Sequence, residues 1–345
     1  MNADKQYVVK NSNEMSDHER KRADDFILAD STNGEFINTF SYLQYHPKGR
    51  FNDDSIVIFD MHSGTVAGCM AAAAAQGNTV ISHSGTTFAG PIVDERYAVK
   101  KKEEILDLML SYYESRYSKI ELKLRPDFYS YQPDQTISYF LLRRGYTYGM
   151  TALANIVNIS AVHSEQDLLK LFSAGRRNHV KKTLKENKFY LHEEKQVLAD
   201  EWSHMNENLK AKYDAVSTHT LEEIKDLKSR FPDKIYPFYV HTHDGQYGAF
   251  ALVYCYKQIF HTQYLDMNYD LAGRYPHLFL IYQLVLKAKE LGYQYISFGA
   301  STENSGKYLN YGLYNYKAGY GGGDLILPLF MKSSKEESFT KEQNE

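Results

Sequence analysis

The segment of residues 297–323 (SFGASTENSGKYLNYGLYNYKAGYGGG) carries side chains that could do chemistry. It combines several glycines with one acid, Glu303, and two lysines, Lys307 and Lys317. Glycine permits turns and close backbone approach, and a lysine ammonium beside such a turn can donate to an anion. A carboxylate just past a strand end can take up a proton. The pattern therefore predicts a site within this segment.

Two stretches of the chain show the same order of expected elements. Residues 55–85 and residues 235–267 each fit an antiparallel meander of strands joined by glycine-containing turns. Each is followed by a helical pattern of apolar residues, at 99–117 and 278–292, and then by another strand. The β-β-β-α-β order occurs twice, which predicts an α+β fold of two mixed sheets flanked by helices. Where neighbouring strands of such a sheet diverge, backbone groups become available to a ligand.

The length of 345 residues suits two domains, and the repeat places their boundary near residue 161. Ser164 is expected to cap the helix that follows it, because acids occupy the first turn of that helix. We predict an N-terminal extension at 1–24, domains at 25–160 and 161–332, and a disordered polar tail at 333–345.

The composition excludes several classes of protein. Hydrophobic residues make up 43% and charged residues 24%, as in globular proteins with an ample core. The formal charge of −3 gives no general attraction to nucleic acid, so no DNA partner is expected. No apolar run is long enough to span a bilayer, and no histidine or cysteine spacing indicates a metal site. Cys69 and Cys255 are expected to be buried free thiols, which favours a cytoplasmic protein.

The segment 297–323 resembles the C-terminal signature of the FemAB-like acyltransferases, which belong to the GNAT superfamily. The family form is F-G-x-S-T-E, then G-x-x-x-N-x-G-L, then aromatic-K-x-G-aromatic-G. The matching residues here are Phe298, Gly299, Ser301, Thr302, Glu303, Gly306, Asn310, Gly312, Leu313, Tyr316, Lys317, Gly319, Tyr320 and Gly321. Tyr320 stands where Phe is more usual. Residues 36–51 (FINTFSYLQYHPKGRF) and 82–93 (SHSGTTFAGPIV) resemble bacterial members associated with cell-surface polysaccharide synthesis, so the similarity spans about residues 25–330.

This resemblance implies two tandem GNAT-like domains that transfer an acyl group to an amine or hydroxyl. The interval 268–277 (NYDLAGRYPH) lacks the glycine-rich pyrophosphate loop of GNAT enzymes that use acyl-CoA. The interval 209–230 is too short for the coiled-coil arm of FemAB members that use aminoacyl-tRNA. The sequence favours acyl-CoA as the donor, with aminoacyl-tRNA as the alternative.

Acyl transfer to an amine needs a base, a donor facing the developing oxyanion, and alignment. Glu303 is the candidate base, Tyr264 and Lys317 are the other catalytic candidates, and His261 is interpreted as a structural histidine. The basic segment 174–190 (AGRRNHVKKTLKENKFY) is either a solvated face or an edge that binds donor phosphates. The predicted donor-binding residues are Arg176, Arg177, Lys181, Arg274, Asn310 and Gly321. The predicted acceptor-binding residues are Tyr42, Arg50, His83, Arg125, Ser301 and Thr302, with a structural role equally open for those of the first domain.

The sequence predicts a cytoplasmic acyltransferase that moves a short acyl group, such as acetyl from acyl-CoA, to an amino group. The expected acceptor is a sugar nucleotide or a cell-surface glycan precursor. One alternative is an aminoacyl-tRNA-dependent transferase that acts on a peptidoglycan precursor. The other is a non-catalytic binding protein of GNAT fold, because neither copy of the repeat carries the CoA loop.

Overall fold

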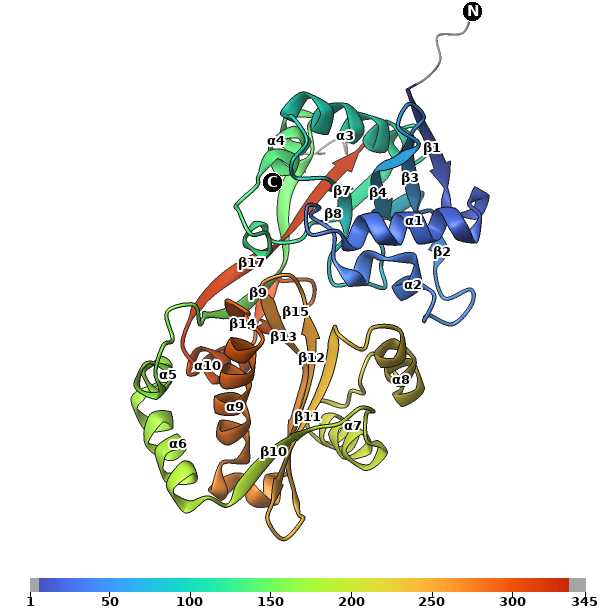
Figure 1. The fold of residues 1–345 in the computed structure, drawn as a ribbon. Coiled ribbons are helices and arrows are strands. Elements are labelled where there is room, and N and C mark those ends of the chain that lie inside the picture. Colours follow the sequence, from blue (N-terminus) through green and yellow to red (C-terminus); the bar gives the residue numbers. More distant parts are fainter. Residues whose placement is uncertain (1–5, 335–345) are drawn as a thin grey trace, which may run out of the picture. The chain divides into compact units, whose positions relative to one another are not determined.

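The structure is a computed structural model that describes residues 6–334. Contacts divide the described chain into two units (Figure 1). Unit 1 comprises residues 6–127, 134–150 and 328–334, and unit 2 comprises residues 128–133 and 151–327. Two long strands, β9 (Thr147–Asn158) and β17 (Gly323–Ser333), contribute residues to both units.

Unit 1 is built from short strands and four helices. Its strands are β1 (Tyr7–Asn11), β2 (Asn52–Asp53), β3 (Ile56–Asp60), β4 (Thr65–Ala71), β5 (Ala73–Ala75), β6 (Thr79–Ile81), β7 (Gly90–Val93) and β8 (Lys119–Lys123). Its α-helices are α1 (Asp17–Leu28), α2 (Phe40–Leu43), α3 (Val99–Glu114) and α4 (Thr136–Arg143). The strands pair in the order β1-β3-β4-β7 and in the order β8-β6-β5-β2.

Alternation along β3 decides which helices cover which face of unit 1. Ile56 and Ile58 belong to a core cluster with residues of α3 and α4, whereas Val57 and Phe59 belong to a cluster with residues of α1 and α2. Successive strand residues point to opposite faces, so helices cover both faces of this sheet.

Unit 2 contains the longer strands. They are β10 (Phe189–Glu193), β11 (Ile235–Thr242), β12 (Tyr247–Cys255), β13 (Ile259–Met267), β14 (Tyr295–Ala300), β15 (Thr302–Glu303) and β16 (Tyr308–Leu309). Its α-helices are α5 (Glu165–Leu171), α6 (Ala174–Glu186), α7 (Ala199–Tyr213), α8 (Leu221–Arg230), α9 (Pro276–Glu290) and α10 (Tyr311–Ala318). The main sheet has the order β10-β11-β12-β13-β14-β9, and β15 pairs with β16 as a small hairpin.

The two faces of the unit 2 sheet are covered by different helices. Val253 on β12 lies in the large core cluster formed with α5, α6 and α9. Phe250, three residues earlier on β12, points to the opposite face of the sheet. Its ring packs edge-on against Trp202 of α7, with ring centroids 6.3 Å apart. The sheet of unit 2 is therefore sandwiched between helices, as mixed α/β layers require.

The predicted repeat of elements is confirmed. In unit 2 the order is β11, β12, β13, α9 and β14, and in unit 1 it is β3, β4 with β5, β6 with β7, α3 and β8. The predicted cap at Ser164 is also present, because its hydroxyl accepts from the Asp167 amide at 3.2 Å. No helix among residues 6–334 is both long and apolar enough to cross a membrane.

The contact-based units differ from the predicted domains at four places among the described residues. Residues 128–133 belong to unit 2. The described part of the predicted extension 1–24 is integral to unit 1, because β1 pairs with β3 and α1 packs on the core. The units meet in sequence at residues 150 and 151 rather than near 161. Residues 328–332 return to unit 1, where β17 pairs with β8. Of the predicted tail 333–345, Ser333 ends β17 and Ser334 bonds to Ser118, and the remainder lies outside the described residues.

Candidate active site

Strands β13 and β14 of unit 2 part from one another after a short parallel pairing. Their register runs from Ile259 opposite Tyr295 to His261 opposite Ser297 and goes no further along the described strands. Beyond this point β13 stays paired with β12 as far as Met267, and β14 stays paired with β9 as far as Ala300. We call the unpaired stretches, residues 262–267 and 298–300, the fork. The facing edges of the fork offer backbone groups to a ligand.

Lys317 of α10 sits at the fork. Its ammonium donates to the Gly299 carbonyl oxygen at 3.2 Å and also to the Ala300 carbonyl oxygen. The side chain is buried, and burial lowers the pKa of Lys317 to about 8. An ammonium has three N–H groups, so two carbonyl acceptors leave one for another partner.

His261 lies beside Lys317 at the last paired position of β13. Its Nδ1 is 3.0 Å from the Ser297 hydroxyl, and a Cβ added to Gly299 would lie 3.3 Å from its ring. Burial, with a smaller effect from the Lys317 charge, lowers the pKa of His261 to about 4. The ring is therefore neutral at pH 7, which fits the structural role expected from the sequence.

A β-bulge separates His261 from Tyr264. Thr262 is opposite Val253 and Tyr264 is opposite Leu252, so Gln263 is the extra residue on β13. Residues three apart on a regular strand point to opposite faces, and one inserted residue brings them to the same face. The Tyr264 hydroxyl lies 2.7 Å from Nδ1 of His219. Neither this bulge nor this contact was predictable from the sequence.

Glu303, the predicted base, is exposed on the β15–β16 hairpin. Its carboxylate accepts from Nδ2 of Asn310 at 2.8 Å. The Oδ1 of Asn310 caps α10 by accepting from the Leu313 amide at 2.9 Å. Asn310, predicted to bind the donor, thus ties the hairpin to the start of α10.

Ser301 and Thr302, predicted to bind the acceptor, bond to β9. The buried Ser301 hydroxyl donates to Oδ1 of Asn155 at 2.8 Å, and Thr302 accepts from the Leu153 amide at 3.3 Å. These bonds hold the β14–β15 connection in place. Neither residue is brought into contact with Lys317 by a described bond.

The glycines at the end of the segment meet the protein's own backbone. Gly321 has a φ of 91°, and a Cβ there would lie 2.5 Å from the Leu171 carbonyl oxygen. Gly322 has a φ of 99° and approaches Ile156 of β9 still more closely. The close backbone approach expected from this pattern is real, but its partners are α5 and β9, so Gly321 has a structural reason to be glycine.

Arg176 and Arg177, predicted to bind donor phosphates, both donate to carbonyls within unit 2. Arg176 donates to the Tyr316 carbonyl near the end of α10 and lies 4.3 Å from the centroid of the Tyr320 ring. Arg177 donates to the Leu169 carbonyl at 3.0 Å and to the Phe172 carbonyl at 3.2 Å, which caps α5. Their role as phosphate ligands stays a prediction, while their packing role is visible.

The start of α9 offers few amides to an anion. Pro276 occupies the first turn and has no N–H, and the amides of Leu278 and Phe279 bond to the Tyr275 carbonyl at 3.1 and 3.2 Å. The preceding 3₁₀ turn, Tyr269–Arg274, contains the exposed Arg274. Free amides at a helix N-terminus are what a bound pyrophosphate needs. The sequence lacks the CoA loop, and the backbone amides of Leu278 and Phe279 at the start of α9 are hydrogen-bonded within the chain. On the nearby helix α6, Lys181 is exposed, whereas Arg176 and Arg177 are half-buried.

In unit 1 the corresponding parallel strands are β6 and β8, and the residues that follow β6 stay bonded to β8. Strands β6 and β8 pair in parallel as far as Ile81 and Glu121. Residues 82–89 then remain on β8: the Lys123 amide donates to the Ser82 hydroxyl at 2.7 Å, and its ammonium donates to the Thr86 carbonyl at 2.5 Å. The Ala89 amide donates to the Lys123 carbonyl at 2.8 Å. Burial lowers the pKa of Lys123 to about 8, as for Lys317.

His83 and Tyr42, predicted to bind the acceptor, meet the same aromatic cluster. The ring of His46 is stacked 5.9 Å from His83 and lies 6.5 Å from Tyr42 between centroids. Burial lowers the pKa of His83 to about 4. Arg50 is exposed at the edge of this cluster, 5.9 Å from the centroid of the Phe51 ring.

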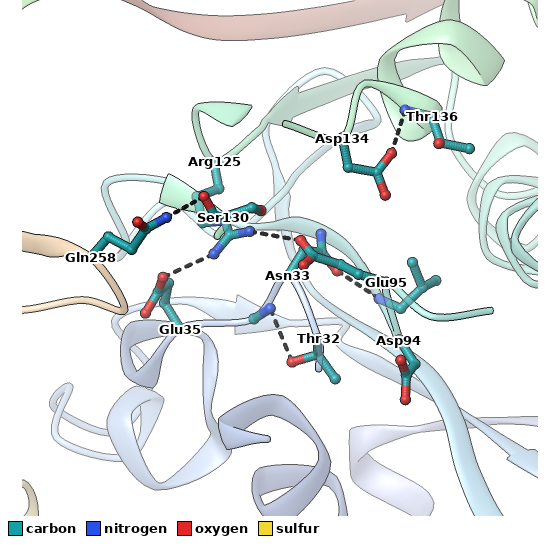
Figure 2. A network of polar contacts seen from close by, with 12 residues as sticks. Thr32, Asn33, Glu35, Asp94, Glu95, Arg125, Ser130, Asp134, Thr136 and Gln258 are labelled. Atoms are coloured by element: carbon teal, nitrogen blue, oxygen red, sulfur yellow. Dashed lines mark hydrogen bonds and ion pairs between the residues drawn. The ribbon is translucent and has the colours of Figure 1, made fainter. Parts of the chain in front are cut away.

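Arg125 belongs to a buried ion-pair network (Figure 2). Its two terminal nitrogens lie 3.0 Å from a Glu35 carboxylate oxygen and 3.2 Å from a Glu95 carboxylate oxygen. The Arg125 and Glu35 side chains are 6% and 4% exposed. Two carboxylates already balance the guanidinium, so its described contacts support a structural role.

Comparisons with known proteins agree with this geometry. The model of the acetyltransferase (GNAT) domain matches residues 174–318, which include α6, the fork and α10. This part of the chain is therefore similar to GNAT acetyltransferase domains. Among curated proteins, none matches the sequence.

Three solved structures resemble nearly the whole chain. FemX is 12% identical with a TM-score of 0.66, over 94% of this chain and 97% of that chain. A C-terminal domain attributed to a lysylphosphatidylglycerol synthetase of Agrobacterium fabrum is 13% identical with a TM-score of 0.58, over 92% of each chain. A tandem GNAT protein from the clavulanic acid biosynthesis pathway is 11% identical with a TM-score of 0.53, over 96% of this chain and 98% of that chain. At these identities the likeness concerns the fold, and the predicted fold of tandem GNAT-like domains is confirmed.

Proposed function

We propose that unit 2 is an acyltransferase that holds the acyl group of its donor at the fork and transfers it to an amine. The observation that carries this proposal is the buried Lys317 ammonium at the point where β13 and β14 part. The match of residues 174–318 to the GNAT acetyltransferase domain supports the same reaction class.

The reaction needs few groups. The acceptor nitrogen attacks the acyl carbonyl carbon, a C–N bond forms, and the carbonyl oxygen becomes an oxyanion. The remaining N–H of Lys317 stabilises that oxyanion, a contribution that is typically worth a factor of about 10² to 10³ in rate. The bond from the acyl carbon to the donor sulfur or oxygen then breaks, the nitrogen gives up one proton, and the leaving thiolate or alkoxide takes up a proton.

Two donors fit the proposal. The GNAT match supports a CoA thioester, most simply acetyl-CoA. The closed start of α9 and the exposed Lys181 and Lys185 of α6 support aminoacyl-tRNA, whose phosphates need no helix N-terminus there. The acceptor class to test first is an amino-sugar nucleotide or a glycan precursor. This acceptor class is supported by the resemblance of residues 36–51 and 82–93 to polysaccharide-associated proteins. The proposal includes a cytoplasmic location for the protein.

We assign the transfer to unit 2 alone. In unit 1 the residues 82–89 occupy the place where unit 2 has the fork, and they bond to β8 through Ser82, Thr86 and Ala89. An acyl group could enter there only after these bonds break.

The test compares two labelled donors, acetyl-CoA and aminoacyl-tRNA, against a panel of UDP-amino sugars, glycan precursors and peptidoglycan precursors. Transfer of label to one acceptor class, lost in Lys317→Met, is the expected result. The matched control is Lys123→Met, which removes a partly buried lysine of unit 1 whose pKa is also lowered to about 8 by burial, and it should leave turnover unchanged. Tight donor binding in a thermal-shift assay without any transfer would instead establish a non-catalytic binding protein.

A further inference from the structure

The hydroxyl of Tyr264 and the ring of His219 form a close polar pair in unit 2. The Tyr264 oxygen and Nδ1 of His219 are 2.7 Å apart, and the two rings meet edge-on with centroids 5.9 Å apart. Trp202 of α7 packs edge-on against the other side of Tyr264 at 5.2 Å. Both rings are therefore held in a single geometry.

The connection between α7 and α8 fixes His219. The Ser217 amide donates to Oδ1 of Asn206 on α7 at 2.8 Å, and the Ser217 hydroxyl donates to the His219 carbonyl at 2.6 Å. The next residue, Thr220, caps α8 by accepting from the Glu223 amide at 3.2 Å. His219 is 6% exposed, so its ring is buried and anchored from both sides.

Tyr264 stands on β13 within the fork, three residues beyond His261. Because the bulge at Gln263 inserts one residue, Tyr264 and His261 project from the same face of the sheet. The Tyr264 side chain is half-buried, whereas His219 behind it is buried. Tyr264 is thus a half-buried residue on a fork strand, and its hydroxyl contacts a buried imidazole.

We propose that Tyr264 and His219 form a proton relay for the transfer reaction. Tyr264 exchanges protons with the substrates, and His219 accepts the proton from Tyr264 and acts as the final base. This inference rests on the proposed acyltransferase function. As the acceptor nitrogen forms its bond to the acyl carbon, its proton passes to the Tyr264 oxygen, and the Tyr264 proton passes to Nδ1 of His219. The imidazolium returns this proton, through Tyr264, to the thiolate or alkoxide that leaves when the tetrahedral intermediate collapses. No other reactant is consumed.

The surroundings of Tyr264 fit this role. Burial raises the pKa of Tyr264, so the phenol is protonated at neutral pH and has a proton to donate. Hydrogen bonds from the backbone and side chain of Thr218, the His219 amide and the side chain of Gln263 act in the opposite direction. These donors stabilise negative charge on the oxygen at the moment when it exchanges protons.

The test uses the full chain with the donor and acceptor found active. His219→Ala should lower kcat on the order of 100-fold with little change in KM, because a base is lost rather than a binding contact. The acidic limb of the kcat pH profile should shift, because a base must be deprotonated to act, the solvent deuterium isotope effect should change, and added imidazole should restore part of the rate. Tyr264→Phe keeps the ring packing and should lose activity without rescue. His163→Ala, at an exposed histidine, is the matched control.

The outcomes separate the relay from the transfer reaction itself. If the wild-type chain transfers an acyl group and His219→Ala keeps its pH profile and isotope effect, the relay is wrong and the proposed function stands. The relay is also wrong if the loss of rate follows a loss of melting temperature and imidazole does not rescue it. If the wild-type chain transfers nothing from either donor, both proposals are wrong.

Discussion

Removal of the Lys317 charge gives the most direct test of the fork. Lys317 donates to the carbonyls of Gly299 and Ala300 while buried, and burial lowers its pKa from 10.5 to about 8. A shift of this size corresponds to about 3 kcal/mol between the charged and neutral forms. We expect Lys317→Met to abolish this dependence of stability on pH and to lower turnover on the order of 10² to 10³-fold.

The sign of the pH effect follows from proton binding. Below pH 8 the folded and unfolded chains both carry the proton, and the full cost of burying the charge is present. Between about pH 8 and 10.5 the unfolded chain binds more protons, so the stability of the folded chain rises with pH. Above 10.5 both are neutral and the effect is complete. Urea denaturation of wild type and Lys317→Met should therefore show a stability difference that changes by up to about 3 kcal/mol across this window.

The turnover of Lys317→Met and of Lys317→Arg completes this test. If the ammonium stabilises the oxyanion, wild-type turnover falls as pH rises through about 8, whereas Lys317→Arg keeps its charge and shows no such fall. A stability difference that stays flat from pH 8 to 10.5 would refute the lowered pKa. Unchanged turnover in Lys317→Met, with the fold intact, would refute the catalytic role.

Three further predictions concern residues singled out in the sequence. The proposed relay assigns the base to His219, so Glu303→Gln should keep wild-type turnover and melting temperature; a loss of turnover on the order of 100-fold at an unchanged melting temperature would instead make this exposed carboxylate the base, as the sequence predicts. Gly321→Ala should cost roughly 1 to 3 kcal/mol in urea denaturation because its φ is 91°, whereas Gly175→Ala, in open space on α6, should be neutral or stabilising; equal effects would contradict the backbone account. Arg125→Met should cost roughly 3 to 5 kcal/mol because it leaves Glu35 buried without the guanidinium, and adding Glu35→Gln should recover part of this loss; no recovery would contradict the ion-pair account.

The order of elements was predictable because it depends on local periodicity. The helical pattern at 278–292 became α9 (Pro276–Glu290), and the strand pattern at 119–124 became β8 (Lys119–Lys123). The pairing of β1 with β3 was missed because residues 1–24 are largely polar, and only the fold shows that their few apolar side chains reach a core. Partners distant in sequence decide such boundaries.

The sequence predicted the residues of the candidate site better than it predicted their contacts. Lys317 was singled out because a lysine beside a glycine turn has little packing purpose, and the structure places it at the fork. Arg176 and Arg177 were singled out by charge, yet carbonyls of α10 and α5 already accept from them. His219 lies 45 residues from Tyr264, so no local pattern could have joined them.

In each unit two parallel strands separate, and the two units treat the resulting strand edges differently. In each unit a short parallel pairing ends, at Ile81 opposite Glu121 in unit 1 and at His261 opposite Ser297 in unit 2. Unit 1 satisfies the exposed backbone with its own residues 82–89, and its partly buried lysine, Lys123, bonds to that inserted segment. In unit 2 the chain runs on as a continuous strand with one bulge, and its buried lysine bonds to the strand edge itself. Because buried backbone groups must be paired, the first solution favours stability and the second favours an external partner. In unit 2 the carbonyls of Gly299 and Ala300 on β14 already accept from Lys317, so the edge with which our proposed ligand would pair is that of β13 beyond His261.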